Sequence, residues 1–211
     1  MKFVNEGHLG GYVAADKKYP NGDPLTYTPA VWEYLLNRYP FKHVVDVGCG
    51  EGHAVRWFMN HPQDFTVMGI EGCTEAFAAI DAPVNNMMLH DFTSGPPRIM
   101  MVPDMLVWCC EFVEHVEEKF SDNFLQVFRQ ASVVAMTHAF PGQPGHHHVN
   151  CQPTEYWLAK MKAIGFSLDY VTTAEARAVA PQSHWERSGL VFLADTLNLP
   201  MRPTVPGPAT E

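Results

Sequence analysis

A glycine-rich turn after a β-branched run constrains the fold of this chain more than any other feature. Residues 43–52 read HVVDVGCGEG and place Asp46, Gly48, Gly50 and Gly52 at the spacing D-x-G-x-G-x-G. Glycines at such a turn let the backbone reverse sharply and let a ligand lie against main-chain atoms. The helix expected next presents free N–H groups at its start. The pattern therefore predicts a ligand-binding strand–turn–helix unit.

The acidic residues around this turn indicate the kind of ligand. Glu71 ends the next apolar run, FTVMGIEG, 21 residues after Gly50, where a doubly wound fold places the carboxylate that binds a ribose. The dinucleotide pattern G-x-G-x-x-G is broken, because His53 or Val55 stands in place of the third glycine. Asp46 suits an ammonium group and disfavours a pyrophosphate. A nucleoside with a cationic amino-acid tail is expected, and S-adenosylmethionine (SAM) fits.

Strand-like and helix-like segments alternate along most of the chain. Thr28 offers a helix cap and Pro29 occupies the first helical position. Helices are expected at residues 29–39, 53–59, 74–80, 120–128 and 153–164. Strands are expected at residues 43–47, 65–72, 86–91, 103–112, 131–140, 167–173 and 188–195. This alternation predicts an α/β domain with a mostly parallel sheet covered by helices on both faces.

The chain divides into three zones, and its 211 residues suit a single domain. Residues 1–28 are expected to form an irregular arm, either a lid over the ligand or a packed extension. Residues 29–195 form the α/β domain. Residues 196–211 contain four prolines and are expected to form an extended, flexible tail.

Composition limits the classes of partner and the cellular compartment that are expected for this chain. The chain has 14 Lys and Arg against 23 Asp and Glu, a net charge of −9, which argues against a protein that binds a phosphate backbone. Its five cysteines lack C-x-x-C spacing, so reduced thiols in a cytoplasmic protein are expected, without disulfides or a Cys₄ zinc site. The first residues lack the apolar run typical of a signal peptide, and no apolar stretch of about 20 residues occurs, so neither a signal peptide nor a membrane span is expected.

The sequence resembles the class I SAM-dependent methyltransferases, especially the small-molecule group called methyltransferase domain type 11. The resemblance covers residues 28–195 and rests on VVDVGCGEG, VMGIEG, HDFTSG and PDMLVWCCEFVEHV in that order. It implies a Rossmann-like, doubly wound, seven-stranded sheet, mostly parallel, whose last strand is antiparallel and inserted, with helices on both faces. The cofactor-binding residues implied are Asp46, Gly48, Gly50, Glu71, Gly72, Asp91, Phe92 and Glu111.

The same resemblance implies a role for each part of that set. The residues of the glycine turn would line the methionine portion of SAM, and Glu71 would hold the ribose. Asp91 would accept a hydrogen bond from the adenine N6, with Phe92 beside the ring. Glu111 would lie near the transferred methyl group. An alternative for Asp91 is a plain helix cap.

The loop PGQPGHHHVN, residues 141–150, is the expected acceptor wall because it follows the fifth strand. His146 and His148 alternate and could face the same side, and His115 comes from the fourth-strand motif. These three residues are the catalytic candidates, since a near-neutral imidazole suits a base for a hydroxyl group. Two alternatives are a structural histidine cluster and a divalent metal site formed by His146 and His148 with His115 or Asp91. No metal ligand is assigned from the sequence.

The expected function is methyl transfer from SAM to a small-molecule or glycan acceptor, most readily at a hydroxyl oxygen. Alternatives are an N- or carboxyl-methyltransferase of the same fold, or a SAM-binding protein without turnover. An NAD enzyme is disfavoured by the glycine pattern. The core leaves no room for a separate recognition domain, so a small acceptor is expected. Given the acidic balance and the lack of a long apolar stretch, nucleic-acid and membrane partners are not expected.

Overall fold

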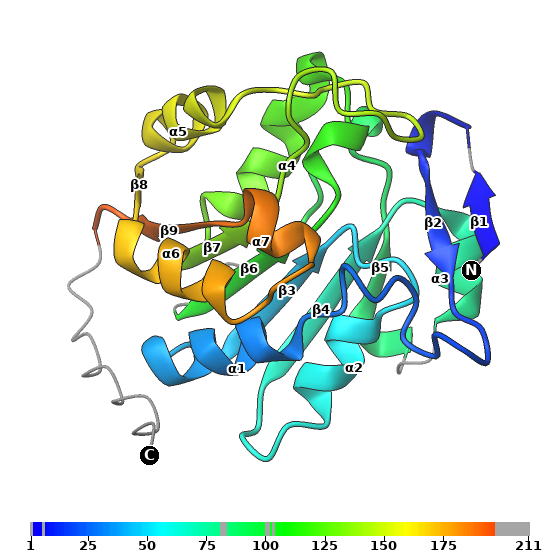
Figure 1. Ribbon diagram of the computed structural model, residues 1–211, viewed down its shortest axis with the longest axis horizontal. Coiled ribbons are helices and arrows are strands. Elements are labelled where there is room, and N and C mark those ends of the chain that lie inside the picture. The colour runs from blue at the N-terminus through cyan, green and yellow to red at the C-terminus, as the bar shows by residue number, and fades with distance from the viewer. Residues whose placement is uncertain (1, 6, 81–83, 100–101, 103, 197–211) are drawn as a thin grey trace.

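The computed structural model describes residues 2–5, 7–80, 84–99, 102 and 104–196. Within these residues a seven-stranded sheet runs through the centre of the molecule in the order β5-β4-β3-β6-β7-β9-β8 (Figure 1). Its strands are β3 (His43–Val47), β4 (Thr66–Glu71), β5 (Met87–Leu89), β6 (Met105–Cys109), β7 (Val133–Met136), β8 (Phe166–Leu168) and β9 (Leu190–Ala194).

The pairing of these strands confirms the expected topology. The strands from β5 to β7 are parallel, with His43 of β3 beside Thr66 of β4 and Met105 of β6. Strand β9 is antiparallel to both β7 and β8 and lies between them. The chain order reverses at β3, from which it proceeds to β4 on one side and later to β6 on the other. Ligands bind at such a switch point, beyond the carboxyl ends of the strands.

Helices cover both faces of the sheet and enclose two apolar cores (Figure 1). The helices of one face are α1 (Pro29–Arg38), α2 (His53–Met59), α6 (Tyr170–Ala178) and α7 (His184–Ser188). On the other face lie α4 (Ser121–Phe128) and α5 (Thr154–Ala163), while α3 (Thr74–Ala79) packs against β4 and β5. The short 3₁₀ helices are η1 (Gly7–Leu9), η2 (Val84–Asn86), η3 (Phe92–Ser94), η4 (Val113–His115) and η5 (Glu118–Phe120).

Strand β6 shows why a continuous apolar run was a reliable strand signal. Its five side chains are all buried, and they alternate between the two cores. Trp108 faces the core of α1 and α7, where it stacks on Trp185 with ring centroids 4.7 Å apart. Val107 faces the core of α4, which contains Phe124. Each fully buried side chain of this size contributes about 1.5–3 kcal/mol.

The strand predicted at residues 167–173 is wrong beyond its first residues. Strand β8 ends at Leu168, and helix α6 begins at Tyr170. The reason is a helix cap, because the carboxylate of Asp169 accepts a hydrogen bond of 2.9 Å from the Thr172 N–H. The β-branched and aromatic residues that suggested a strand include Tyr170 and Val171, which are largely exposed on α6.

The N-terminal arm is also more regular than predicted. Strands β1 (Lys2–Asn5) and β2 (Gly11–Ala14) form an antiparallel pair that turns through η1. Helix α7 was not predicted; it begins after Ser183, whose hydroxyl accepts from the Glu186 N–H. The tail predicted at residues 196–211 lies outside the described residues, apart from residue 196.

All five cysteines lie among the described residues. No disulfide joins any two of them, and Cys49, Cys73 and Cys109 are buried. None of the described helices is long and apolar enough to cross a membrane.

Candidate functional site

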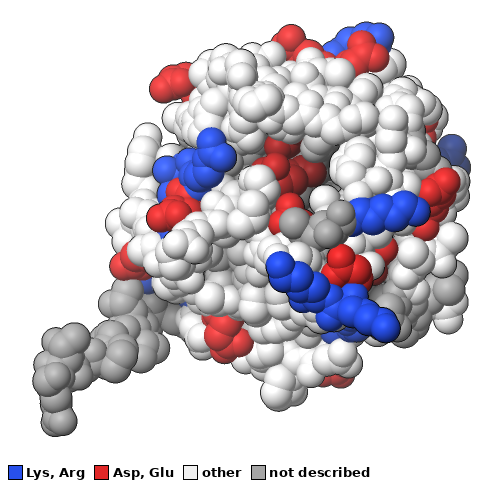
Figure 2. Space-filling view, turned by 45° about the vertical axis from the view of Figure 1, so that its right-hand side comes forward, with Lys and Arg blue, Asp and Glu red and all other residues white. Residues whose placement is uncertain are grey.

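A cleft of about 290 Å³ opens at the carboxyl ends of β3, β4 and β6. All eleven site residues predicted from the sequence line it, and the N-terminal arm forms one of its walls. Seven acidic side chains line the cleft, whereas no lysine or arginine among the described residues does so. Figure 2 shows acidic side chains inside a hollow of the molecular surface. A cleft of this charge favours a cationic ligand and disfavours a polyanion.

The glycine turn between β3 and α2 forms the floor of the cleft. Gly48 and Gly50 have φ angles of +75° and +54°, a region that favours glycine. A Cβ on Gly48 would lie 2.4 Å from the ring of Phe112, so this position has no room for a side chain. A Cβ on Gly50 would meet no atom within 4 Å. Gly50 therefore leaves open space beside the backbone.

Glu71, at the end of β4, ties the two strand ends together. Its carboxylate accepts hydrogen bonds from the Gly50 N–H at 2.7 Å and the Cys73 N–H at 2.8 Å. Gly72 follows, and a Cβ there would approach Leu9 of the arm at 3.1 Å. The carboxylate is thus fixed in orientation by backbone groups at the edge of the cleft.

Asp46 lies deeper, near the end of β3, and is 4% exposed. Burial, reinforced by the negative charge of Glu71, raises the pKa of Asp46 from 3.8 to about 8. The side chain is therefore largely protonated at pH 7 while no cation is near it. A positively charged group in the cleft would favour the ionised form.

Asp91 and Phe92 stand beyond β5 on the other side of the turn. Asp91 caps η3, since its carboxylate accepts from the Thr93 N–H at 2.7 Å, as the plain-cap alternative predicted. It also lines the cleft and lies 3.0 Å from Nε2 of His8 in the arm. Burial raises the pKa of Asp91, but the hydrogen bonds from His8 and Thr93 outweigh it and hold this pKa below its usual value. Phe92 is buried beside Phe112.

Glu111 follows β6 in a left-handed backbone conformation, with a φ of +53° that is unusual for a side chain of this size. Its N–H donates to the hydroxyl of Thr137 at 2.8 Å. Its carboxylate lies 3.4 Å from Nδ1 of His184, whose Nε2 is 3.8 Å from Asp23. Burial opposes the positive charge of His184, yet Asp23 and Glu111 together raise its pKa. Sequence reasoning missed His184 because it missed helix α7.

The three candidate histidines do not act as one group. The rings of His115 and His148 are neighbours, with centroids 5.1 Å apart. His146 is separated from His148: its Nε2 lies 3.0 Å from the amide oxygen of Asn5, and its ring packs on Phe3. His146 and His148 thus both line the cleft, but His146 contacts the N-terminal arm whereas His148 lies beside His115. Burial and the neighbouring His148 lower the pKa of His115 to about 4.

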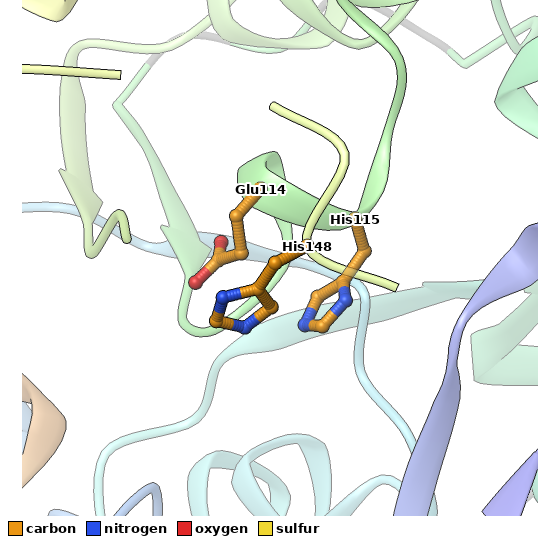
Figure 3. Close-up of side chains that lie close together, drawn as sticks. All are labelled: Glu114, His115 and His148. Atoms are coloured by element: carbon orange, nitrogen blue, oxygen red, sulfur yellow. The ribbon is translucent and has the colours of Figure 1, made fainter. Parts of the chain in front are cut away.

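Glu114, next to His115, was not among the residues selected from the sequence. It is fully buried, and neither of its carboxylate oxygens has a hydrogen-bond partner. Burial and the charge of Glu111 raise its pKa. Glu114, His115 and His148 each offer one potential metal-ligand atom, and these atoms lie within 4.8 Å of one another (Figure 3). The spacing E-x-x-E-H at residues 111–115 was the signal in the sequence.

Among known proteins, matches to this chain were found only among solved structures. No protein-family model matches the sequence, and no curated protein matches it. The small RNA methyltransferase HEN1 superposes with a TM-score of 0.56 and 16% identity over 90% of this chain and 27% of its own. The plantazolicin methyltransferase BpumL, solved with a pentazolic desmethylPZN analogue and S-adenosylhomocysteine (SAH), superposes with a TM-score of 0.54 and 10% identity over 82% of this chain and 86% of its own. The [4+2]-cyclase SpnF gives 0.52 and 14% over 86% and 84%.

These likenesses concern the fold. The chain has the Rossmann-like fold of the class I SAM-dependent methyltransferases, as the sequence motifs predicted. A cyclase among the similar structures shows that the fold also supports other chemistry. The reaction must therefore be argued from the side chains of the cleft.

Proposed function

We propose that this protein is a SAM-dependent methyltransferase that methylates a hydroxyl oxygen of a small-molecule or glycan acceptor. The observation that carries the proposal is a cleft at the switch point of the sheet, lined by acidic side chains and, among the described residues, by no lysine or arginine. SAM carries a sulfonium and an ammonium group, so this environment matches its charge. BpumL, which shares the fold, was solved with SAH.

Each predicted cofactor contact has a physical basis in the cleft. Asp46 would ionise and pair with the ammonium of the methionine portion, which lies along Gly48 and Gly50. The carboxylate of Glu71 is oriented by two backbone hydrogen bonds at the edge of the cleft and would accept from a ribose hydroxyl. Gly72 lines the cleft next to Glu71, at a point where a Cβ would crowd Leu9 of the arm at 3.1 Å.

The adenine and the reacting methyl would lie at the ends of the cofactor. Asp91 would accept from the adenine N6, with the buried Phe92 against the ring. Glu111 would lie near the sulfonium, held there by Thr137 and His184. These contacts leave the acceptor to approach from the side of the histidine loop.

Methyl transfer is an in-line displacement in which the acceptor oxygen attacks the methyl carbon and the C–S bond breaks, giving neutral SAH. The protein must align the oxygen, carbon and sulfur and exclude water. The hydroxyl proton needs an acceptor, and His146, the exposed imidazole of the wall, is proposed for it. His115 and His148 are proposed to contact the acceptor.

The alternatives differ in the acceptor. HEN1 is a small RNA methyltransferase, which raises the question of a nucleic-acid acceptor. The acidic cleft and the net charge of −9 disfavour a phosphate backbone at this site. N-methylation, carboxyl-methylation and SAM binding without turnover would use the same cofactor contacts. An assay of the methylated product distinguishes them from methylation of a hydroxyl oxygen.

A labelled-methyl assay tests the proposal. SAM carrying a labelled methyl group is offered with panels of phenols and sugars, amines, carboxylates and short RNA, and the labelled product is identified. We expect product with a hydroxyl panel, a loss of at least about 100-fold in Glu71→Gln, and no loss in Glu75→Gln, an exposed neighbour outside the cleft. SAH binding without product from any panel would favour the protein without turnover.

A further inference from the structure

The buried carboxylate of Glu114 lacks the partner that its position requires. The side chain is 0% exposed, and neither oxygen accepts a hydrogen bond. An unpaired buried carboxylate is strongly destabilising, so such groups pair with a cation, bind a metal or take up a proton. No lysine or arginine lines the adjoining cleft among the described residues. The neighbouring groups that could bind a cation together with this carboxylate are two imidazoles.

These imidazoles belong to His115 and His148, which face one another beside Glu114 (Figure 3). Nδ1 of His115 is itself buried without a hydrogen-bond partner. One carboxylate oxygen and two imidazole nitrogens form a donor set that suits divalent manganese, iron, cobalt or zinc. Atoms bound to one ion at about 2.1 Å lie up to about 4 Å apart. Small side-chain rotations therefore suffice to close a separation of 4.8 Å.

The backbone holds the two segments of this cluster together. The N–H groups of Val149 and Asn150 both donate to the carbonyl oxygen of Glu114 at 3.0 Å. The buried amide of Asn150 donates to the carbonyl of Val113 at 3.3 Å. Nδ1 of His148 lies 3.1 Å from the carbonyl oxygen of Gln143, an orienting contact of the kind that metal-binding histidines use. The histidine loop is thus fixed on η4.

We propose that Glu114, His115 and His148 bind one divalent transition-metal ion at the acceptor end of the cleft. Three protein ligands leave coordination positions open, as in catalytic rather than structural sites. His115 and His148 line the cleft, so the open positions face it. The metal alternative considered from the sequence combined His146 and His148 with His115 or Asp91, and in the cluster proposed here Glu114 takes the place of His146.

The role of the ion rests on the proposed function. An acceptor hydroxyl bound to the ion has a lowered pKa and loses its proton more readily. The proton passes to His146 and then to solvent, the oxygen forms the new C–O bond, and the C–S bond of SAM breaks. His115 and His148 then serve as ligands.

Metal binding is tested without turnover. Chelator-treated full-length protein is titrated with Mn²⁺, and the free ion is followed by its electron paramagnetic resonance signal; Zn²⁺ is then added as a competitor. We expect one Mn²⁺ per chain, displaced by Zn²⁺. Glu114→Gln and His148→Ala should each weaken binding at least about tenfold. His147→Ala, in the same loop but outside the cluster and the cleft lining, should bind as the wild type does.

Two further measurements distinguish a wrong metal assignment from a variant that has lost its fold or its cofactor site. Thermal unfolding and SAH binding show whether each variant is folded with its cofactor site intact. If Glu114→Gln does not fold, the metal titration of His148→Ala alone tests the ligand assignment. Wild-type protein that binds SAH but neither Mn²⁺ nor Zn²⁺ would overturn the metal site and leave the proposed function standing. Mn²⁺ binding that survives both ligand substitutions would overturn the assignment of the ligands.

Discussion

Asp46 links the charge of the cleft to the stability of the protein. Its pKa of about 8 in the folded chain compares with 3.8 for the unfolded chain. Between these values the unfolded chain releases the proton and the folded chain keeps it. Stability therefore falls as pH rises through this window, by about 1.4 kcal/mol per pH unit, and the loss ends above about pH 8.

Replacement of this carboxyl tests both its protonation and its role. Asp46→Asn removes the titration, so the variant should gain stability relative to the ligand-free wild type between pH 5 and pH 8. The same variant should bind SAH at least about tenfold more weakly, because the ammonium loses its counter-charge. Urea unfolding across this pH range and calorimetry with SAH measure the two effects. A variant that binds SAH normally would remove Asp46 from the cofactor site.

Gly48 and Gly50 provide a matched pair of substitutions in one turn. Both have positive φ, so alanine at either position costs about 1–2 kcal/mol in backbone strain. Gly48→Ala adds a collision with Phe112 and should be the more destabilising. Gly50→Ala should fold but bind SAH weakly, because its Cβ enters the space left for the ligand. Urea unfolding and SAH affinity measure the difference; equal stability losses with unchanged SAH binding would contradict it.

At the scale of elements, the β1–β2 arm is fastened to the cleft at several points. His8 lies against Asp91, Asn5 against His146, and the Ala15 N–H donates to Glu51 at 2.9 Å. These contacts favour a lid, one of the two roles expected for the arm. They are also few and partly exposed, so they can open without loss of the core.

We therefore predict that His8→Ala speeds the release of SAH several-fold and changes the unfolding free energy by less than about 1 kcal/mol. Lys162→Ala is the control, since it removes an exposed ion pair with Asp195 outside the cleft lining. Chasing bound SAH with excess unlabelled SAH measures the release rate. An unchanged rate in His8→Ala would support a packed extension.

Local signals predicted most elements because they act within a few residues. Pro29 begins α1, and the glycine turn stops β3 and begins α2 at His53, all as expected. The strand prediction failed at Tyr170 because a β-branched and aromatic run can also lie on a helix face exposed to solvent. The cap formed by Asp169 favours a helix over a strand at this point. It can act as a cap because β8 ends at Leu168, directly before it.

At the scale of the whole molecule, strand order accounts for what the sequence could predict about the site. Parallel strands end at one edge, so Asp46, Glu71 and Glu111 meet there although they are far apart in the chain. His184 and the burial of Glu114 could not be foreseen in this way. They arise where α7 and the histidine loop pack back onto that edge, and such packing depends on the complete fold.

The proposed function requires that this cleft bind SAM in preference to a dinucleotide. Titration calorimetry of the folded protein with SAH, and separately with NAD, tests it most directly. We expect one bound SAH per chain and no measurable binding of NAD, because the acidic cleft repels a pyrophosphate. Folded protein that binds NAD, or that fails to bind SAH, would contradict it.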